Sequence, residues 1–161
     1  MAKDKNKTNA MRIAESKKAD FEVLTYDCAE FMDGVSIAQK VGQPAEQTFK
    51  TLVTQGKSRE YFVCVVPVAC ELDLKKAAKV FGEKSLEMIH VKEIFGLTGY
   101  VRGGCSPIGM KKQFRTVVHE SALGFDKIMF SGGRLGAQMK MSPRDLERIT
   151  GAQFADIIHQ G

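Results

Sequence analysis

The sequence predicts a single α+β domain built on a mixed or antiparallel sheet. Its 161 residues, 43% hydrophobic and 27% charged, have the composition of an ordinary globular domain. Strand-like and helical segments follow one another irregularly, without a regular βαβ alternation, and this order is typical of α+β folds. Residues 49–56 and 60–69 are β-rich and flank a short turn, which predicts a hairpin. Pro67 inside the second segment predicts that this strand lies at a sheet edge or a bulge.

The N-terminal elements follow from capping residues and spacing. Residues 1–7 are expected to form a disordered basic tail, and residues 8–161 the folded domain. Thr8 can cap a first helix whose apolar residues lie roughly on one face. A strand is expected from Phe21, and residues 34–42 have helical spacing that ends in a glycine.

The second half of the chain continues the mixture of helices and strands. An amphipathic pattern ending in glycine predicts a helix over residues 71–82. Ser142, Pro143 and Asp145 supply a cap, a first-turn proline and a first-turn acid, so another helix begins there after a strand. The remaining predicted elements are a strand at 86–91, a helix at 91–99, and strands at 115–120 and 127–133.

Charge and cysteine usage narrow the class of protein. The net charge of +5 and the isoelectric point near 9.0 favour anionic partners such as nucleic acid or phosphorylated ligands. The four cysteines form no C-x-x-C pair and the three histidines fall in no metal-ligand spacing, so we expect neither a metal nor another cofactor. The charged N-terminus lacks a signal-peptide apolar run, and no segment approaches the ~20 apolar residues of a membrane span. A cytoplasmic protein with reduced thiols is expected.

Two glycine-rich segments are candidates for binding an anion. Gly103 and Gly104 allow another molecule to approach the main chain, and exposed amides in such a turn can bind an anion or a developing oxyanion. The segment 131–136 places Ser131 and Arg134 where they could hold a phosphate or ribose, although it matches neither a Walker loop nor a dinucleotide-binding motif. Each segment could equally be a simple turn.

Three side chains each allow a functional and a structural interpretation. Lys50 lies in a β-rich segment and could enter a cleft as a strong electrostatic group, or could protect a sheet edge. Tyr26 could offer a functional hydroxyl or belong to the periphery of the core. For Cys105 we favour a small buried packing residue over a thiolate nucleophile.

Four ordered segments resemble the YbaK/EbsC-type bacterial prolyl-tRNA editing family. They are FKTLV, VPVACELDLKKAAKVFG, LTGYVRGGCSPIGMKK and KIMFSGGRLG, and the likeness extends over residues 9–158. The resemblance implies a twisted sheet with barrel-like curvature packed by helices. It also implies a deacylase that clears mischarged aminoacyl-tRNA, most of all Cys-tRNA(Pro), in trans to the synthetase.

The resemblance also implies roles for particular residues. Lys50 would hold the ester carbonyl or the terminal ribose, Tyr26 would orient the amino acid, and the amide of Gly103 would face the oxyanion. The implied substrate-binding residues are Gly104, Ser131, Thr51, Gly132 and Arg134. The implied tRNA-phosphate contacts are Lys111, Lys112 and Arg115.

In the chemistry that the resemblance implies, the thiol of the substrate cysteine attacks its own ester and releases a thiolactone, with no protein nucleophile. The expected partners are the acceptor end of a mischarged tRNA and, as a further option, prolyl-tRNA synthetase. Cys28 replaces a histidine common in the family and Asp33 an aromatic residue, and the loop from Tyr26 to Gly34 is shorter, which leaves the preferred amino acid open. The alternatives are a hydrolytic deacylase for alanyl or seryl tRNA, and a non-catalytic tRNA-binding accessory protein.

Overall fold

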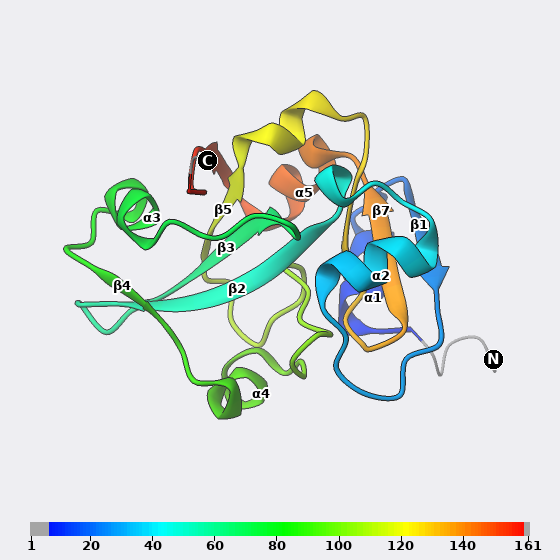
Figure 1. Cartoon of the computed structure of the whole chain (residues 1–161), viewed down its shortest axis with the longest axis horizontal. Coiled ribbons are helices and arrows are strands. Elements are labelled where there is room, and N and C mark those ends of the chain that lie inside the picture. The colour runs from blue at the N-terminus through cyan, green and yellow to red at the C-terminus, as the bar shows by residue number, and fades with distance from the viewer. Residues whose placement is uncertain (1–6, 160–161) are drawn as a thin grey trace.

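A computed structural model describes residues 7–159 of the chain. Of the predicted tail, residues 1–6 lie outside the described residues. Its last residue, Lys7, has its Nζ 2.9 Å from a carboxylate oxygen of Glu15. The predicted mixture of helices and strands is confirmed, and Figure 1 shows how the elements are arranged.

The strands form two sheets, where the sequence predicted one. The three-stranded sheet is antiparallel and runs in the order β1 (Phe21–Thr25), β7 (Ala137–Met141), β6 (Ile128–Ser131). The five-stranded sheet is mixed and runs in the order β4 (Leu86–Met88), β2 (Phe49–Gly56), β3 (Tyr61–Pro67), β5 (Arg115–His119), β8 (Gln153–Ala155). A bridge between Thr48 and Met129 joins the two sheets. Within the described residues they curve about a shared core without closing into a barrel.

Five α-helices and three short 3-10 helices connect the strands of residues 7–159. The α-helices are α1 (Asn9–Ser16), α2 (Gly34–Val41), α3 (Leu74–Phe81), α4 (Ile94–Thr98) and α5 (Pro143–Thr150), and the 3-10 helices are η2 (Ala45–Gln47), η3 (Val91–Glu93) and η4 (Glu120–Gly124). The predicted caps are confirmed: the side chains of Thr8 and Ser142 accept the amide hydrogens of Met11 and Asp145. Helix α3 begins later than predicted, because Asp73 caps it.

Strand β3 is internal, so the prediction of an edge position from Pro67 is wrong. β3 lies between β2 and β5. The pairing with β5 covers only Phe62 to Val65, and Pro67 ends β3 opposite Phe49 of β2. The missing amide hydrogen of the proline therefore interrupts no ladder. Strand β8 was not predicted, because three residues are too few to show an alternation.

The five-stranded sheet is covered on both faces. Val63 and Val65 of β3 belong to the larger core, which the three-stranded sheet and α1 share, whereas Cys64 and Val66 face α3 and belong to a smaller one. A strand buried on both faces reads as a continuous apolar run, which is the pattern of residues 61–66. In Figure 1, α3 and β4 accordingly lie at one end of the molecule and α1, α2 and the three-stranded sheet at the other.

His119 gives the fold a pH dependence that can be measured. The side chain is buried, its Nδ1 accepts the amide hydrogen of Ile157 at 3.3 Å, and burial lowers its pKa although Asp156 opposes this effect. A histidine whose folded pKa is depressed stabilises the fold above the unfolded pKa of about 6.5, and the contribution is lost as pH falls toward the folded value.

We therefore expect the free energy of unfolding to fall between pH 7 and pH 5.5, and to fall less in His119→Asn. Urea unfolding at the two pH values measures the difference. Equal pH slopes for the two proteins would contradict the assignment to His119.

Candidate functional site

A pocket of about 460 Å³ lies at an open edge of β2. Strand β4 pairs with β2 only from Thr54 to Gly56, and the last contact of this segment is the amide of Ile89, which donates to the carbonyl of Val53. The N-terminal half of β2 therefore has a free edge. The pocket is lined by every residue from 48 to 53, by parts of 31–37, 88–94 and 102–105, and by Ser131 and Gln138. Its volume is that of a small-molecule site.

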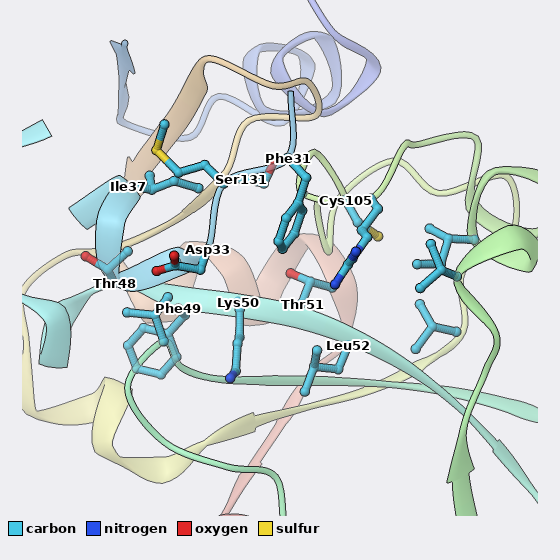
Figure 2. A pocket seen from close by; sticks show the side chains of 18 of the residues that line it. Phe31, Asp33, Ile37, Thr48, Phe49, Lys50, Thr51, Leu52, Cys105 and Ser131 are labelled. Carbon is cyan, nitrogen blue, oxygen red and sulfur yellow. The ribbon is translucent and has the colours of Figure 1, made fainter. Parts of the chain in front are cut away.

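Neighbouring residues of one strand line the same pocket. Side chains alternate along a strand, and Figure 2 shows Thr51 pointing toward Phe31 while Lys50 and Leu52 project from the other face of β2. Residues of both faces of β2 are nevertheless among those that line the pocket. The hydroxyl oxygen of Thr51 is buried and has no hydrogen-bond partner in residues 7–159.

Lys50 is a lining residue whose ammonium projects from the face of β2 opposite to Thr51. It is half-buried and lines the pocket, and it takes part in no ion pair or hydrogen bond with the other described residues. A cation with no neutralising partner at a partly dehydrated site attracts an anionic or carbonyl oxygen more strongly than a fully hydrated lysine does. Lys50 is thus free to interact with a ligand.

Ser131 and Gln138 form another wall, as a directly opposed pair on β6 and β7. The hydroxyl of Ser131 accepts the amide hydrogen of Gly133 at 3.2 Å, so its own hydrogen can still be donated. Gln138 is only 3% exposed, yet its Oε1 has no hydrogen-bond partner among the described residues. A buried amide oxygen without a partner is costly, so this oxygen is available to a donor, either the nearby Tyr26 hydroxyl or a polar ligand group. Gln138 was not predicted, because nothing in the sequence distinguishes it from an ordinary strand residue.

Tyr26 lies behind this wall and is not among the residues that line the pocket. Its amide donates to the carbonyl of Gly136 at 2.9 Å, and its hydroxyl is buried without a hydrogen-bond partner in the described chain. Burial raises the pKa of Tyr26, although the nearby groups of Gly136 and Gln138 lower it. The hydroxyl is therefore protonated at neutral pH and lies close to Gln138.

The two glycine segments pack against each other. Val101–Gly104 is a tight turn in which the amide of Gly104 donates to the carbonyl of Val101 at 2.9 Å, and Gly103 at its third position has φ of +84°. Gly103 lines the pocket. The amide of Gly104 already donates to Val101, so the prediction that the Gly104 amide could face an oxyanion is wrong. Gly132 and Arg134 are not among the lining residues. The backbone of Arg134 packs against Gly104 of the turn, whereas Gly132 lies against Met11 and Ala137.

Replacement of Gly104 tests this packing. A Cβ at this position would lie 3.0 Å from the Cα and carbonyl carbon of Arg134, and backbone atoms cannot move aside easily. We expect Gly104→Ala to destabilise the fold by about 1–3 kcal/mol, as overpacking does. Gly124→Ala is the matched control, since a Cβ there meets nothing within 4 Å. Urea unfolding measures both, and equal effects would contradict the close approach of the two segments.

Cys105 lies in the pocket wall as a buried thiol. It is 8% exposed, and burial raises its pKa to about 11. A thiol with this pKa is protonated at neutral pH, which agrees with the packing role predicted from the sequence. Residues 7–159 contain no group of three histidine, cysteine or acidic side chains placed to hold a metal ion.

The three predicted tRNA contacts differ in their surroundings. Lys111 and Lys112 are exposed, with their ammonium groups 5.6 Å and 6.0 Å from the ring centroids of Phe95 and Phe114. Arg115 instead donates to the carbonyl of Phe81 at 3.1 Å and to Gln153 at 3.3 Å. The exposed Arg115 is therefore tied by hydrogen bonds to the last residue of α3 and to the first residue of β8.

Arg102 and Phe31 form a stacked pair at the mouth of the pocket. The guanidinium carbon of Arg102 lies 3.9 Å from the ring centroid of Phe31, and both residues line the pocket. The sequence analysis singled out neither residue, since nothing in the sequence indicates that they meet.

The fold and the pocket define an α+β protein with a small-molecule-sized pocket at the open edge of a sheet, lined by polar groups without partners among the described residues. No helix in the described part of the chain has the length and apolar character of a membrane span. A family model described as the aminoacyl-tRNA editing domain matches residues 30–149. The chain belongs to the aminoacyl-tRNA editing domain family.

Individual relatives agree with this assignment. The chain is 44% identical over 160 residues to the Enterococcus faecalis protein named "Putative Cys-tRNA(Pro)/Cys-tRNA(Cys) deacylase EbsC", and the match covers 98% of each chain. A crystal structure described as "a putative trans-editing enzyme for prolyl tRNA synthetase" has a TM-score of 0.83 at 27% identity, covering 94% of this chain and 96% of that one. The hypothetical protein APE2540 shares the fold, with a TM-score of 0.84 at 24% identity over 94% of this chain and 100% of its own.

Proposed function

We propose that this protein is a trans-acting deacylase that removes cysteine from mischarged tRNA(Pro). Membership of the editing family and the name of the 44% identical relative support the substrate class. The observation that carries the proposal is the pairing of a free cation, Lys50, with the unpartnered oxygens of Thr51 and Gln138 in one pocket. An aminoacyl ester of adenosine offers the complementary groups: a carbonyl, ribose hydroxyls and an α-ammonium.

The charges of the substrate suggest how it lies in the pocket. The α-ammonium is a donor, and the Oε1 of Gln138 is a deeply buried acceptor without a partner. We place the ammonium at Gln138, and the ester carbonyl or the terminal ribose at Lys50. Thr51 and Ser131 then remain to contact the ribose hydroxyls, and the amide of Gly103 to face the oxyanion.

The proposed reaction uses the substrate's own thiol. The cysteine sulfur attacks the ester carbonyl carbon, the bond from that carbon to the ribose oxygen breaks, and the thiol proton passes to the departing oxygen. The products are cysteine thiolactone and tRNA with a free terminal hydroxyl. An intramolecular thiol has a high effective concentration, so the protein has only to fold the substrate and stabilise the oxyanion.

Cys105→Ser tests whether the protein supplies a nucleophile. We expect the variant to keep most of the activity, because the attacking sulfur belongs to the substrate and the buried Cys105 is a protonated thiol. Deacylation rates measured beside the circular dichroism spectrum separate chemistry from folding. A folded but inactive variant would show that the thiolate of Cys105 acts in the reaction.

A panel of cysteinyl, alanyl and seryl tRNA(Pro) tests the substrate. Fast loss of cysteine alone is the expected result, because serine has the same size but a far weaker nucleophile. Equal loss of alanine would favour a hydrolytic deacylase. Tight binding of all three without loss of the ester would favour a non-catalytic accessory protein.

A further inference from the structure

The mouth of the pocket is surrounded by exposed apolar side chains. Seven large hydrophobic residues of the described chain are exposed, and five of them gather on this side: Phe31, Met88, Val91, Phe95 and Val101. The first three of the five line the pocket itself, and Phe95 and Val101 adjoin the lining residues Ile94 and Arg102. A contiguous exposed apolar patch of this kind usually marks an interaction site.

Phe95 is the most exposed member of the patch, at 59%. It lies on α4, which forms part of the pocket wall through Ile94. Neither helix packing nor the core accounts for Phe95, since it is absent from both apolar clusters. Its ring is therefore largely open to solvent.

Cations accompany the aromatic rings of the patch. The ammonium of Lys111 lies 5.6 Å from the ring centroid of Phe95 and donates to the carbonyl of Gly96, so it is held in place. Arg102 lies over Phe31 at 3.9 Å. Aromatic faces next to cations are the arrangement by which proteins bind single-stranded nucleic acid, since bases stack on the rings and phosphates meet the charges.

We propose that Phe95, with Lys111 beside it, stacks a base of the single-stranded 3′ end of the tRNA, next to the terminal adenosine. The inference rests on the proposed function, because it takes the terminal aminoacyl-adenosine to occupy the pocket. The strand must then leave the pocket over its rim, where the patch lies. The charge complementarity of Lys111 and Arg102 favours a nucleic acid over an apolar protein surface.

Comparison of a long with a short substrate tests the proposal. We expect Phe95→Ala to raise KM for cysteinyl-tRNA(Pro) by about 5- to 100-fold, the effect of losing one stacked base, and to leave the turnover of cysteinyl-adenosine unchanged. Phe95→Trp should keep the activity on tRNA, because an indole ring stacks on a base as a phenyl ring does. Phe95→Leu should lose it, because leucine has no aromatic ring. Leu123→Ala is the matched control, since Leu123 is 43% exposed but does not line the pocket.

Equal losses on both substrates, or no loss on tRNA, would overturn the stacking role. So would a change of sedimentation coefficient in Phe95→Ala without a change in KM, because the patch would then be a contact between two copies of the chain. If the wild type deacylates neither substrate, the proposed function fails, but anisotropy of a labelled CCA oligonucleotide still decides the inference. Weaker binding by Phe95→Ala would support it, and unchanged binding would refute it.

Discussion

Lys50→Ala is expected to reduce kcat/KM for cysteinyl-tRNA(Pro) by about 100-fold or more, the usual effect of removing a group that stabilises a transition-state charge. Lys50 lies on β2, at the edge where the substrate would lie, and lines the pocket. It has no ion-pair or hydrogen-bond partner among the described residues. Without the Lys50 ammonium, no lysine charge would stabilise the oxyanion that forms during thiol attack. The fold should be unaffected, since Lys50 makes no ion pair or hydrogen bond with other described residues.

The controls for this prediction come from the same hairpin. Lys57→Ala, in the exposed turn after β2, removes an equal charge away from the pocket and should leave the rate unchanged. Circular dichroism and urea unfolding check that both variants fold. Retained activity in Lys50→Ala would remove the lysine from the chemistry.

Gln138→Met is expected to have opposite effects on stability and on activity. The wild-type amide is almost fully buried with an unpartnered Oε1, and an apolar side chain of similar shape removes this penalty. We expect the free energy of unfolding to rise by about 1 kcal/mol, within the range measured for unsatisfied buried polar groups. We also expect kcat/KM to fall by about 10- to 100-fold, because a hydrogen bond to the charged ammonium is lost.

A modified substrate separates this role from a general disturbance of the pocket. Acetylation of the α-amino group removes the positive charge, so the wild type should lose most of its activity on N-acetyl-cysteinyl-tRNA(Pro). Gln138→Met should lose little more, because the contact is already absent. If both changes reduce the rate independently, the ammonium does not lie at Gln138.

The sequence predicted the elements of the fold better than their assembly. The caps at Thr8 and Ser142 are local features, and local chemistry decides them. The position of β3 inside the sheet depends on how far β5 extends beside it, which no local pattern shows, so Pro67 was misleading. The short β8 forms only because the chain returns to the edge of β5 after α5.

Some residues of the pocket could likewise be predicted from the sequence, and others only from the structure. Lys50, Thr51, Gly103 and Ser131 were singled out from the sequence, and the structure brings all four to one pocket. Gln138 could not be found, because its significance lies in a missing partner, and Arg102 meets Phe31 only in the folded chain. Charge alone does not show that Arg115 also hydrogen-bonds to Phe81 and Gln153 within the fold.

The chemical form in which cysteine is released is the most direct test of attack by the substrate thiol. Cysteinyl-tRNA(Pro) would be mixed with the protein, quenched at early times, and the small-molecule product identified by mass spectrometry. We expect cysteine thiolactone as the first product, formed at a rate that Lys50→Ala lowers by about 100-fold or more and Cys105→Ser preserves. Free cysteine from the earliest times, with no thiolactone, would contradict attack by the substrate thiol and would require water as the nucleophile.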